Sequence, residues 1–169
     1  MALSESLGAT VLSAGSAHAT GFRGRESACA VENHPMDISE AVRGAHLLAA
    51  DIERSLGFSA KVGTEYPEQW RRFHELAERA IPTAWVSISV PEVGTTIALD
   101  PSDPGSTTAE GFAMELVQVL QDDIQIHLRE PWPRDPAASG HALAATERGW
   151  QSTVDRDHLV PYGELGLAT

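Results

Sequence analysis

Hydrophobic residues recur at helical spacing after Met36, in a pattern that predicts a long amphipathic helix. Asp37 and Glu40 form a capping box at its start, and Gly57 is a typical residue for its end. The apolar positions repeat every three or four residues, at Ile38, Ala41, Val42, Ala45, Leu48, Ala49, Ile52 and Leu56. We therefore expect residues 37–56 to form a helix that buries one face.

The same periodicity predicts two further helices. One begins near Pro67, which a first helical turn tolerates, and ends at Pro82. Its apolar face consists of Trp70, Phe73, Ala77 and Ala80. The other begins at Thr107, which opens a second capping box, and reaches toward Glu130.

Between the second and third helices the hydrophobic period changes to two. Residues 84–90 alternate like a half-buried strand and residues 95–99 return after a turn, which predicts a β-hairpin. A second hairpin is expected from residues 141–146 and 150–154, around a turn at Glu147-Arg148-Gly149. The predicted fold class is α+β, with three helices packed on a small antiparallel sheet built from hairpins.

Residues 1–36 have no sustained period and are rich in Ala, Ser, Gly and Thr, so we expect a disordered N-terminal tail. Residues 37–169 are then a single α+β domain, long enough to bury a core without a disulfide or a metal. A start of translation at Met36 instead of Met1 fits the pattern equally well.

Charge and cysteine content limit the possible partners. The chain has 24 acidic and 12 basic residues, a net charge of −12, which argues against nucleic acid or an anionic membrane as partner. A protein partner for the acidic surface fits better. The single cysteine, Cys29, allows no internal disulfide and no multi-thiolate zinc site, and it favours a cytoplasmic location.

Six acidic residues lie on or near the first two predicted helices. The simplest interpretation is a solvated surface, and an acidic face for a basic partner is the alternative. The six are Asp51, Glu53, Glu65, Glu68, Glu75 and Glu78.

Asp123 and His127 are the most unusual pair in the third predicted helix. Helical spacing places them near the centre of the apolar stripe marked by Phe112, Leu116 and Leu120. Residues four apart share a helix face, so the carboxylate could orient the imidazole, or both could hold a metal. Alternatively the helix extends beyond the core, and the pair is an ordinary surface contact.

The last third of the chain contains several short motifs, among them Trp132-Pro133, Gly140-His141 and Trp150. Through these motifs it resembles a group of small, uncharacterised actinobacterial proteins. In that group a Gln-Asp helix leads into a Trp-Pro-x-Cys-Pro-x-His-like turn, then a tryptophan-containing strand with a second cysteine. In this chain Asp135 stands in place of the first cysteine, and Gln151-Ser152-Thr153 has no second one. The resemblance rests on Leu120-Gln121-Asp122, Trp132-Pro133, Pro136, Gly140-His141, Trp150 and Pro161-Tyr162-Gly163-Glu164-Leu165.

Without thiols, Asp135, His141 and His158 could still supply oxygen and nitrogen ligands to a divalent metal. The alternative is a structural aromatic clamp, in which Trp132 and Trp150 pack together and the polar residues face solvent.

No sequence motif points to a definite reaction, since there is no phosphate-binding glycine loop and no nucleophile elbow. The interpretation we favour is a non-catalytic cytoplasmic interaction module, or a subunit of a larger assembly, with no required cofactor. The alternative is a metal-assisted hydrolase or a structural metal-binding domain that uses Asp123, His127 and the C-terminal histidines.

Overall fold

The structure is a computed structural model that describes residues 36–66, 71, 76, 84–102, 105–138 and 140–167. All of them belong to one compact unit, Asn33–Thr169. The expected tail lies outside the described residues except for Met36, which is buried in the core. The helix expected between Pro67 and Pro82 also lies outside them apart from Arg71 and Leu76, so the described part has two helices where three were expected.

Helix α1, Ile38–Leu56, forms where its periodicity predicts. The Asp37 side chain accepts a hydrogen bond from the Ser39 N–H at 2.9 Å, which satisfies one free donor of the first turn. At the other end, Gly57 takes a left-handed conformation with φ of 70°, and its N–H donates to the Glu53 carbonyl. The expected N-cap and stop are therefore confirmed. In this described part of the chain the reciprocal half of the capping box is not formed, because the Glu40 carboxylate accepts from Arg43 at 2.8 Å.

Helix α3, Ala109–Leu128, is capped by Thr108, one residue later than expected. The Thr108 hydroxyl accepts a hydrogen bond from the Gly111 N–H at 3.1 Å. The two helices approach closely at Gly44, where an added Cβ would lie 2.3 Å from the Ala109 carbonyl oxygen. Glycine is required here because two helix backbones meet.

The first sheet has the order β1-β2-β3, from β1 (Lys61–Gly63), β2 (Val86–Val90) and β3 (Thr95–Leu99), all antiparallel. The predicted hairpin of residues 84–99 is confirmed as β2 and β3. The side chains of Val86, Ile88 and Val90 are fully buried on the face toward the helices. On the opposite face Ser89 and Thr96 hydrogen-bond across the strands at 2.9 Å.

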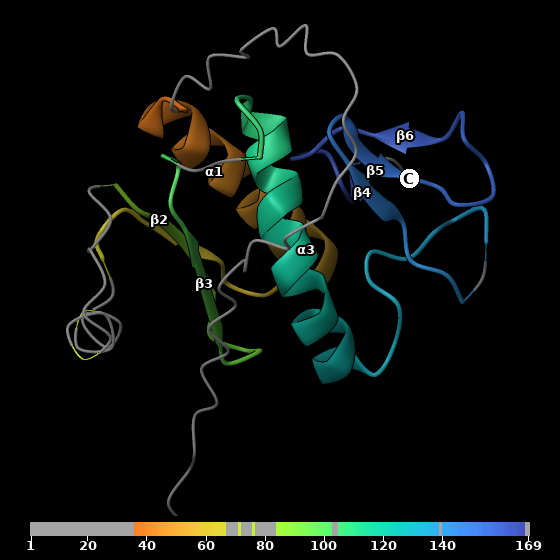
Figure 1. The fold of residues 1–169 in the computed structure, drawn as a ribbon. Helices are drawn as coiled ribbons and strands as arrows, with labels where there is room; N and C mark the ends of the chain where they lie inside the picture. Colours follow the sequence, from red (N-terminus) through yellow and green to blue (C-terminus); the bar gives the residue numbers. More distant parts are fainter. Residues whose placement is uncertain are drawn as a thin grey trace, which may run out of the picture. The chain divides into compact units, whose positions relative to one another are not determined.

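The second sheet has the order β4-β5-β6, from β4 (Ala144–Thr146), β5 (Gly149–Gln151) and β6 (Leu159–Val160). Figure 1 shows α1 and α3 between the two sheets, with β2 and β3 on one side and β4 to β6 on the other. The α+β class is confirmed, but the expectation of one sheet was wrong. The helix pair separates the two hairpins, so their strands cannot pair with each other.

One hydrophobic core joins the helices to both sheets. It contains Leu48 and Ile52 of α1, Phe112 and Leu116 of α3, and Trp150 of β5. In the part of the chain that the structure describes, no helix is long and apolar enough to cross a membrane.

Candidate functional site

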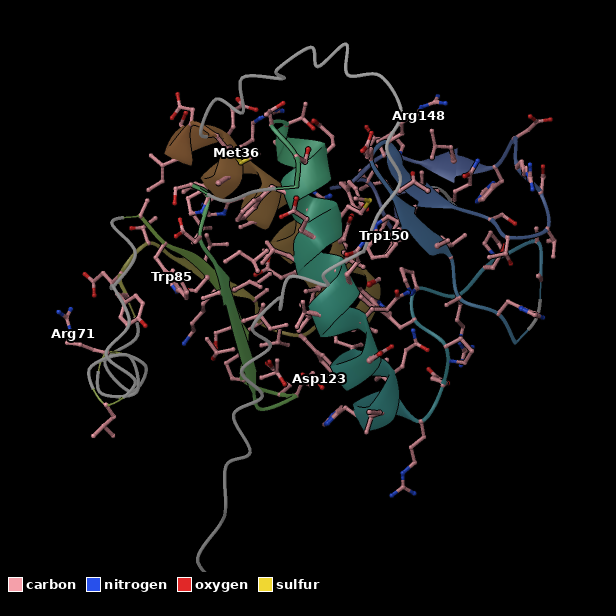
Figure 2. The ribbon with its side chains drawn as sticks, viewed as in Figure 1. Met36, Arg71, Trp85, Asp123, Arg148 and Trp150 are labelled. Carbon is pink, nitrogen blue, oxygen red and sulfur yellow. The ribbon has the colours of Figure 1, made fainter. Side chains whose placement is uncertain are left out.

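The Asp123 and His127 pair lies at the end of α3 and does not form a joint site. Asp123 is half-buried, and its carboxylate accepts a hydrogen bond from the Thr95 hydroxyl at 2.9 Å. Figure 2 shows Asp123 near the turn between β2 and β3. His127 is exposed and meets Phe58 edge to face, with ring centroids 5.8 Å apart. Within the described ranges no hydrogen bond joins the two side chains. Ile124 between them is fully buried, so the helix still packs on the core here while His127 faces solvent.

Asp51 of α1 is one of two buried carboxylates among the described residues. Its side chain is 0% exposed and accepts a hydrogen bond from the Trp150 indole N–H at 2.7 Å. Its other oxygen accepts from the Leu165 backbone N–H at 2.8 Å. Figure 2 shows Trp150 on the side of the C-terminal sheet that faces the helices. Asp51 therefore ties β5 and the C-terminal turn to α1.

Burial sets the protonation preference of Asp51. Removal from water raises the pKa of its carboxyl, against the lowering effect of the hydrogen bonds from Trp150, Gly163 and Leu165. A raised pKa can mark a catalytic acid, but a catalytic acid must reach a substrate. Asp51 has no exposed atom and both oxygens are occupied, which makes it a structural carboxylate.

Sequence patterning assigned Asp51 to a solvated acidic surface, and for this residue that interpretation was wrong. A signal was present in the sequence, because Asp51 lies three residues after Leu48 and one before Ile52, on the edge of the apolar stripe. The Trp150 and Leu165 donors that permit its burial come from 99 and 114 residues further along the chain. Local periodicity does not reveal them.

A second buried carboxylate, Asp135, joins segments of the C-terminal region by hydrogen bonds. It is 4% exposed, and its Oδ2 accepts a hydrogen bond from the Ser152 hydroxyl at 2.7 Å. Its Oδ1 accepts from the Ala137 N–H at 2.9 Å. Burial acts to raise the pKa of Asp135, but the bonds from Ser152, Ala137 and Thr153 and the nearby His158 outweigh it and lower the pKa.

The three predicted metal ligands are placed differently from one another. Asp135 is buried, His141 is exposed, and His158 is half-buried with an Nε2 atom that is shielded from water and has no hydrogen-bond partner. Across the described residues, no group of three or more His, Cys, Asp or Glu side chains is arranged to hold a metal ion. Asp135 is instead bonded to a serine hydroxyl and to backbone N–H groups.

Trp132 and Trp150 make the contact expected of an aromatic clamp. Their rings meet edge to face with centroids 5.4 Å apart, and Trp150 meets Tyr162 in the same way at 5.3 Å. The Trp132 indole N–H donates to the Ser55 hydroxyl at 3.0 Å. Both tryptophans are buried, so the clamp attaches the C-terminal region to α1.

Gln121 and Gln125 lie on the side of α3 toward the C-terminal region and hold it by hydrogen bonds. Sequence reasoning quoted Gln121 only within a resemblance and did not single out Gln125. The Gln121 amide donates to the carbonyls of Trp132 and Leu143, at 2.8 and 3.2 Å. The Gln125 amide donates to the same Trp132 carbonyl at 3.2 Å. These bonds fix the chain where it leaves the helix.

A shallow surface depression lies beside this exit, and we call it the α3-end surface. Its lining consists of Asp122, Gln125, Ile126, Glu130 and Pro131. Ile126 is 75% exposed. A second depression adjoins it across Pro131 and is lined by Pro131, Arg134, Asp135, Pro136 and Gly140. These open, partly apolar depressions suit a partner surface better than a reacting small molecule.

Comparison with other proteins identifies no family. No protein-family model matches the chain, and neither the curated proteins nor the solved structures include a match.

Proposed function

We propose that this chain is a non-catalytic cytoplasmic protein-binding module and that the α3-end surface is its docking site. The observation that carries the proposal is the side chain of Ile126, which is 75% exposed at the edge of a surface depression. Helix α3 stays packed on the core beyond Leu120, with Ile124 fully buried, and Ile126 lies on its solvent side. Contact with a second protein would remove this apolar side chain from water, which is favourable.

The buried groups that could perform chemistry support this interpretation. Asp51 and Asp135 are the two buried carboxylates of the described residues, and each is bonded to N–H or hydroxyl donors that hold the fold together. Asp123 is bonded to Thr95. A hydrolytic site needs a base or a metal-bound water beside an open substrate position, and these carboxylates do not provide one.

The charge of the chain supports a protein partner. A net charge of −12 repels nucleic acid and anionic membranes and attracts proteins with a basic surface. Such attraction accelerates the first encounter, and apolar contacts then determine how long the complex lasts.

Site-specific photo-crosslinking in the native cells would test the proposal. We expect a photoreactive phenylalanine analogue at position 126 to form discrete protein adducts. The same analogue at Val154, which is 61% exposed on another part of the surface, serves as the control. Equal labelling from both positions, or none from position 126, would contradict the docking site.

The hydrolase alternative has its own measurement. The purified full chain is assayed on a panel of esters, phosphoesters and peptides, with and without added zinc or manganese. Turnover that disappears in an Asp123→Ala variant would overturn the non-catalytic proposal.

A further inference from the structure

We infer that the α3-end surface recognises an extended protein segment in which an apolar side chain lies between two basic ones. This inference rests on the proposed function and adds the chemistry of the partner.

The charged groups that line the surface are carboxylates, which accept hydrogen bonds. Asp122 and Glu130 each present a carboxylate, and Asp122 is exposed with no ion pair among the described residues. Gln125 donates one of its two amide N–H groups to the Trp132 carbonyl, and its side-chain oxygen remains an acceptor. Pro131 has no backbone N–H. A ligand must therefore bring the donors, and a basic side chain brings several.

The end of α3 adds to the attraction for a cation. The helix ends at Leu128, and Arg129 takes a left-handed conformation with φ of 57°. The last carbonyl groups of a helix have no partner within it and give that end a partial negative charge. Basic groups are favoured beside such an end.

Arg134 is the competitor that a basic ligand would meet, because it already pairs with Glu130. The Arg134 side chain is 71% exposed and the Glu130 side chain 43%. Solvent-exposed ion pairs contribute little to stability, so a ligand cation can replace Arg134 at low cost.

The spacing of the lining residues determines the pattern of the ligand. Asp122 and Ile126 are four residues apart, about 6 Å along the helix. Glu130 lies beyond Ile126 and lines the same depression. In an extended segment, alternate side chains point to one side about 7 Å apart. A basic-x-apolar-x-basic segment therefore places its apolar side chain over Ile126 and its basic groups near Asp122 and Glu130.

The test uses the full ¹⁵N-labelled chain and the synthetic peptide acetyl-Ser-Arg-Ser-Leu-Ser-Arg-Ser-amide, followed by two-dimensional NMR. We expect shifts of the backbone signals of Asp122, Ile126 and Glu130, with affinity that falls as salt is raised. Peptides with Glu for both Arg, or with Ser for Leu, should bind at least about tenfold more weakly, a difference of about 1.4 kcal/mol. If either control peptide binds as tightly as the parent, or if the parent causes no shifts in these residues, the inference is wrong.

Variants of exposed residues give a second readout without threatening the fold. Asp122→Asn should weaken peptide binding about threefold, and Arg134→Ala should strengthen it about twofold because the competitor for Glu130 is gone. Asp157→Asn is the matched control, because it removes one negative charge from an exposed position elsewhere. We expect it to weaken peptide binding only slightly, through the change in net charge. Weaker binding by Arg134→Ala would overturn the assigned role of Glu130.

Failure of this inference can be told apart from failure of the proposed function. If the analogue at position 126 crosslinks to protein segments without basic residues, the proposed protein-binding function stands and the inferred basic ligand is wrong. If the peptide binds but no cellular protein crosslinks at position 126, the proposed function is wrong. The inferred preference of the surface for basic ligands then stands.

Discussion

The two sheets of this protein are attached to the same helix pair by different means. The β1-β2-β3 sheet contacts the helices mainly through apolar side chains, such as Val86, Ile88 and Val90, which are fully buried. The β4-β5-β6 sheet has strands of two or three residues, and it is attached through Asp51, the two tryptophans and the α3 glutamines.

The difference shows how a region with little regular structure can still be well fixed. Apolar packing tolerates substitution by a residue of similar volume, whereas a buried hydrogen bond requires a particular atom at a particular place. The C-terminal region should therefore be much more sensitive to single polar substitutions than the first sheet. Substitutions in the two regions test this contrast.

The largest effect is expected from Asp51→Ala. It leaves the Trp150 indole N–H and the Leu165 N–H buried without an acceptor, and each such donor costs about 1–3 kcal/mol. We expect a loss of about 4 kcal/mol in the free energy of unfolding, measured by urea denaturation. Asp122→Ala, which removes an exposed acid, serves as the control, and equal losses from both variants would show that Asp51 is not an anchor.

Gly44→Ala tests the helix pair itself. The added Cβ would lie 2.3 Å from the Ala109 carbonyl oxygen, so the helices must separate. We expect a loss of about 2–3 kcal/mol, typical of overpacking. Because the clash is with a backbone atom, Ala109→Gly should not rescue the variant in thermal or urea unfolding. Rescue would contradict the close backbone approach.

Ser152→Ala should have a smaller effect, limited to the C-terminal region. It removes the hydroxyl that donates to Asp135 and accepts from the Val154 and Asp155 N–H groups, at 3.2 and 3.0 Å. We expect Tm to fall by about 3–6 °C. Exchange of the Trp150 indole N–H should accelerate, while exchange in β2 changes little; an equal acceleration in both would contradict separate attachment.

The two buried carboxylates should respond to pH in opposite directions. The pKa of Asp51 is raised from 3.8 on folding, so its stabilisation is complete below pH 3.8 and is lost as the pH rises through the folded-state value. The destabilisation caused by Asp51→Asn should therefore shrink as the pH rises across this window.

For Asp135 the pKa is lowered from 3.8, so its stabilisation is present above pH 3.8 and is lost as the pH falls through the folded-state value. Urea unfolding of Asp51→Asn and Asp135→Asn at several pH values checks both signs. The same pH trend in both variants would show that one direction is wrong.

Local signals in the sequence were sufficient for the long elements. Asp37 and Gly57 delimit α1, and the alternation around Ile88 identifies the β2-β3 hairpin. The turn at Glu147 and Arg148 joins β4 to β5, close to the position expected. These features depend on residues that are neighbours in the chain, and such patterns are visible without a structure.

The remaining features depend on contacts between distant residues. Strands β1 and β6 are too short to show a period, and Leu159–Val160 is a strand only because it pairs with Trp150 and Gln151. The Asp123 and His127 pair drew attention through its spacing, yet the partner of Asp123 is Thr95 on another element. The roles of Asp51 and Ser152 likewise became visible only when their partners were located.

The hydrogen bonds of Asp51 also limit the order in which parts of the chain can fold during synthesis. Trp150 and Leu165 are 99 and 114 residues downstream, so a ribosome completes α1 long before it makes either partner. Until then the Asp51 carboxylate must remain hydrated, because no donor exists to replace water. Contacts of such long sequence separation form slowly, since closing the intervening loop costs chain entropy. The emerging chain therefore keeps a charged position on α1 that is covered only after Trp150 and Leu165 have been made.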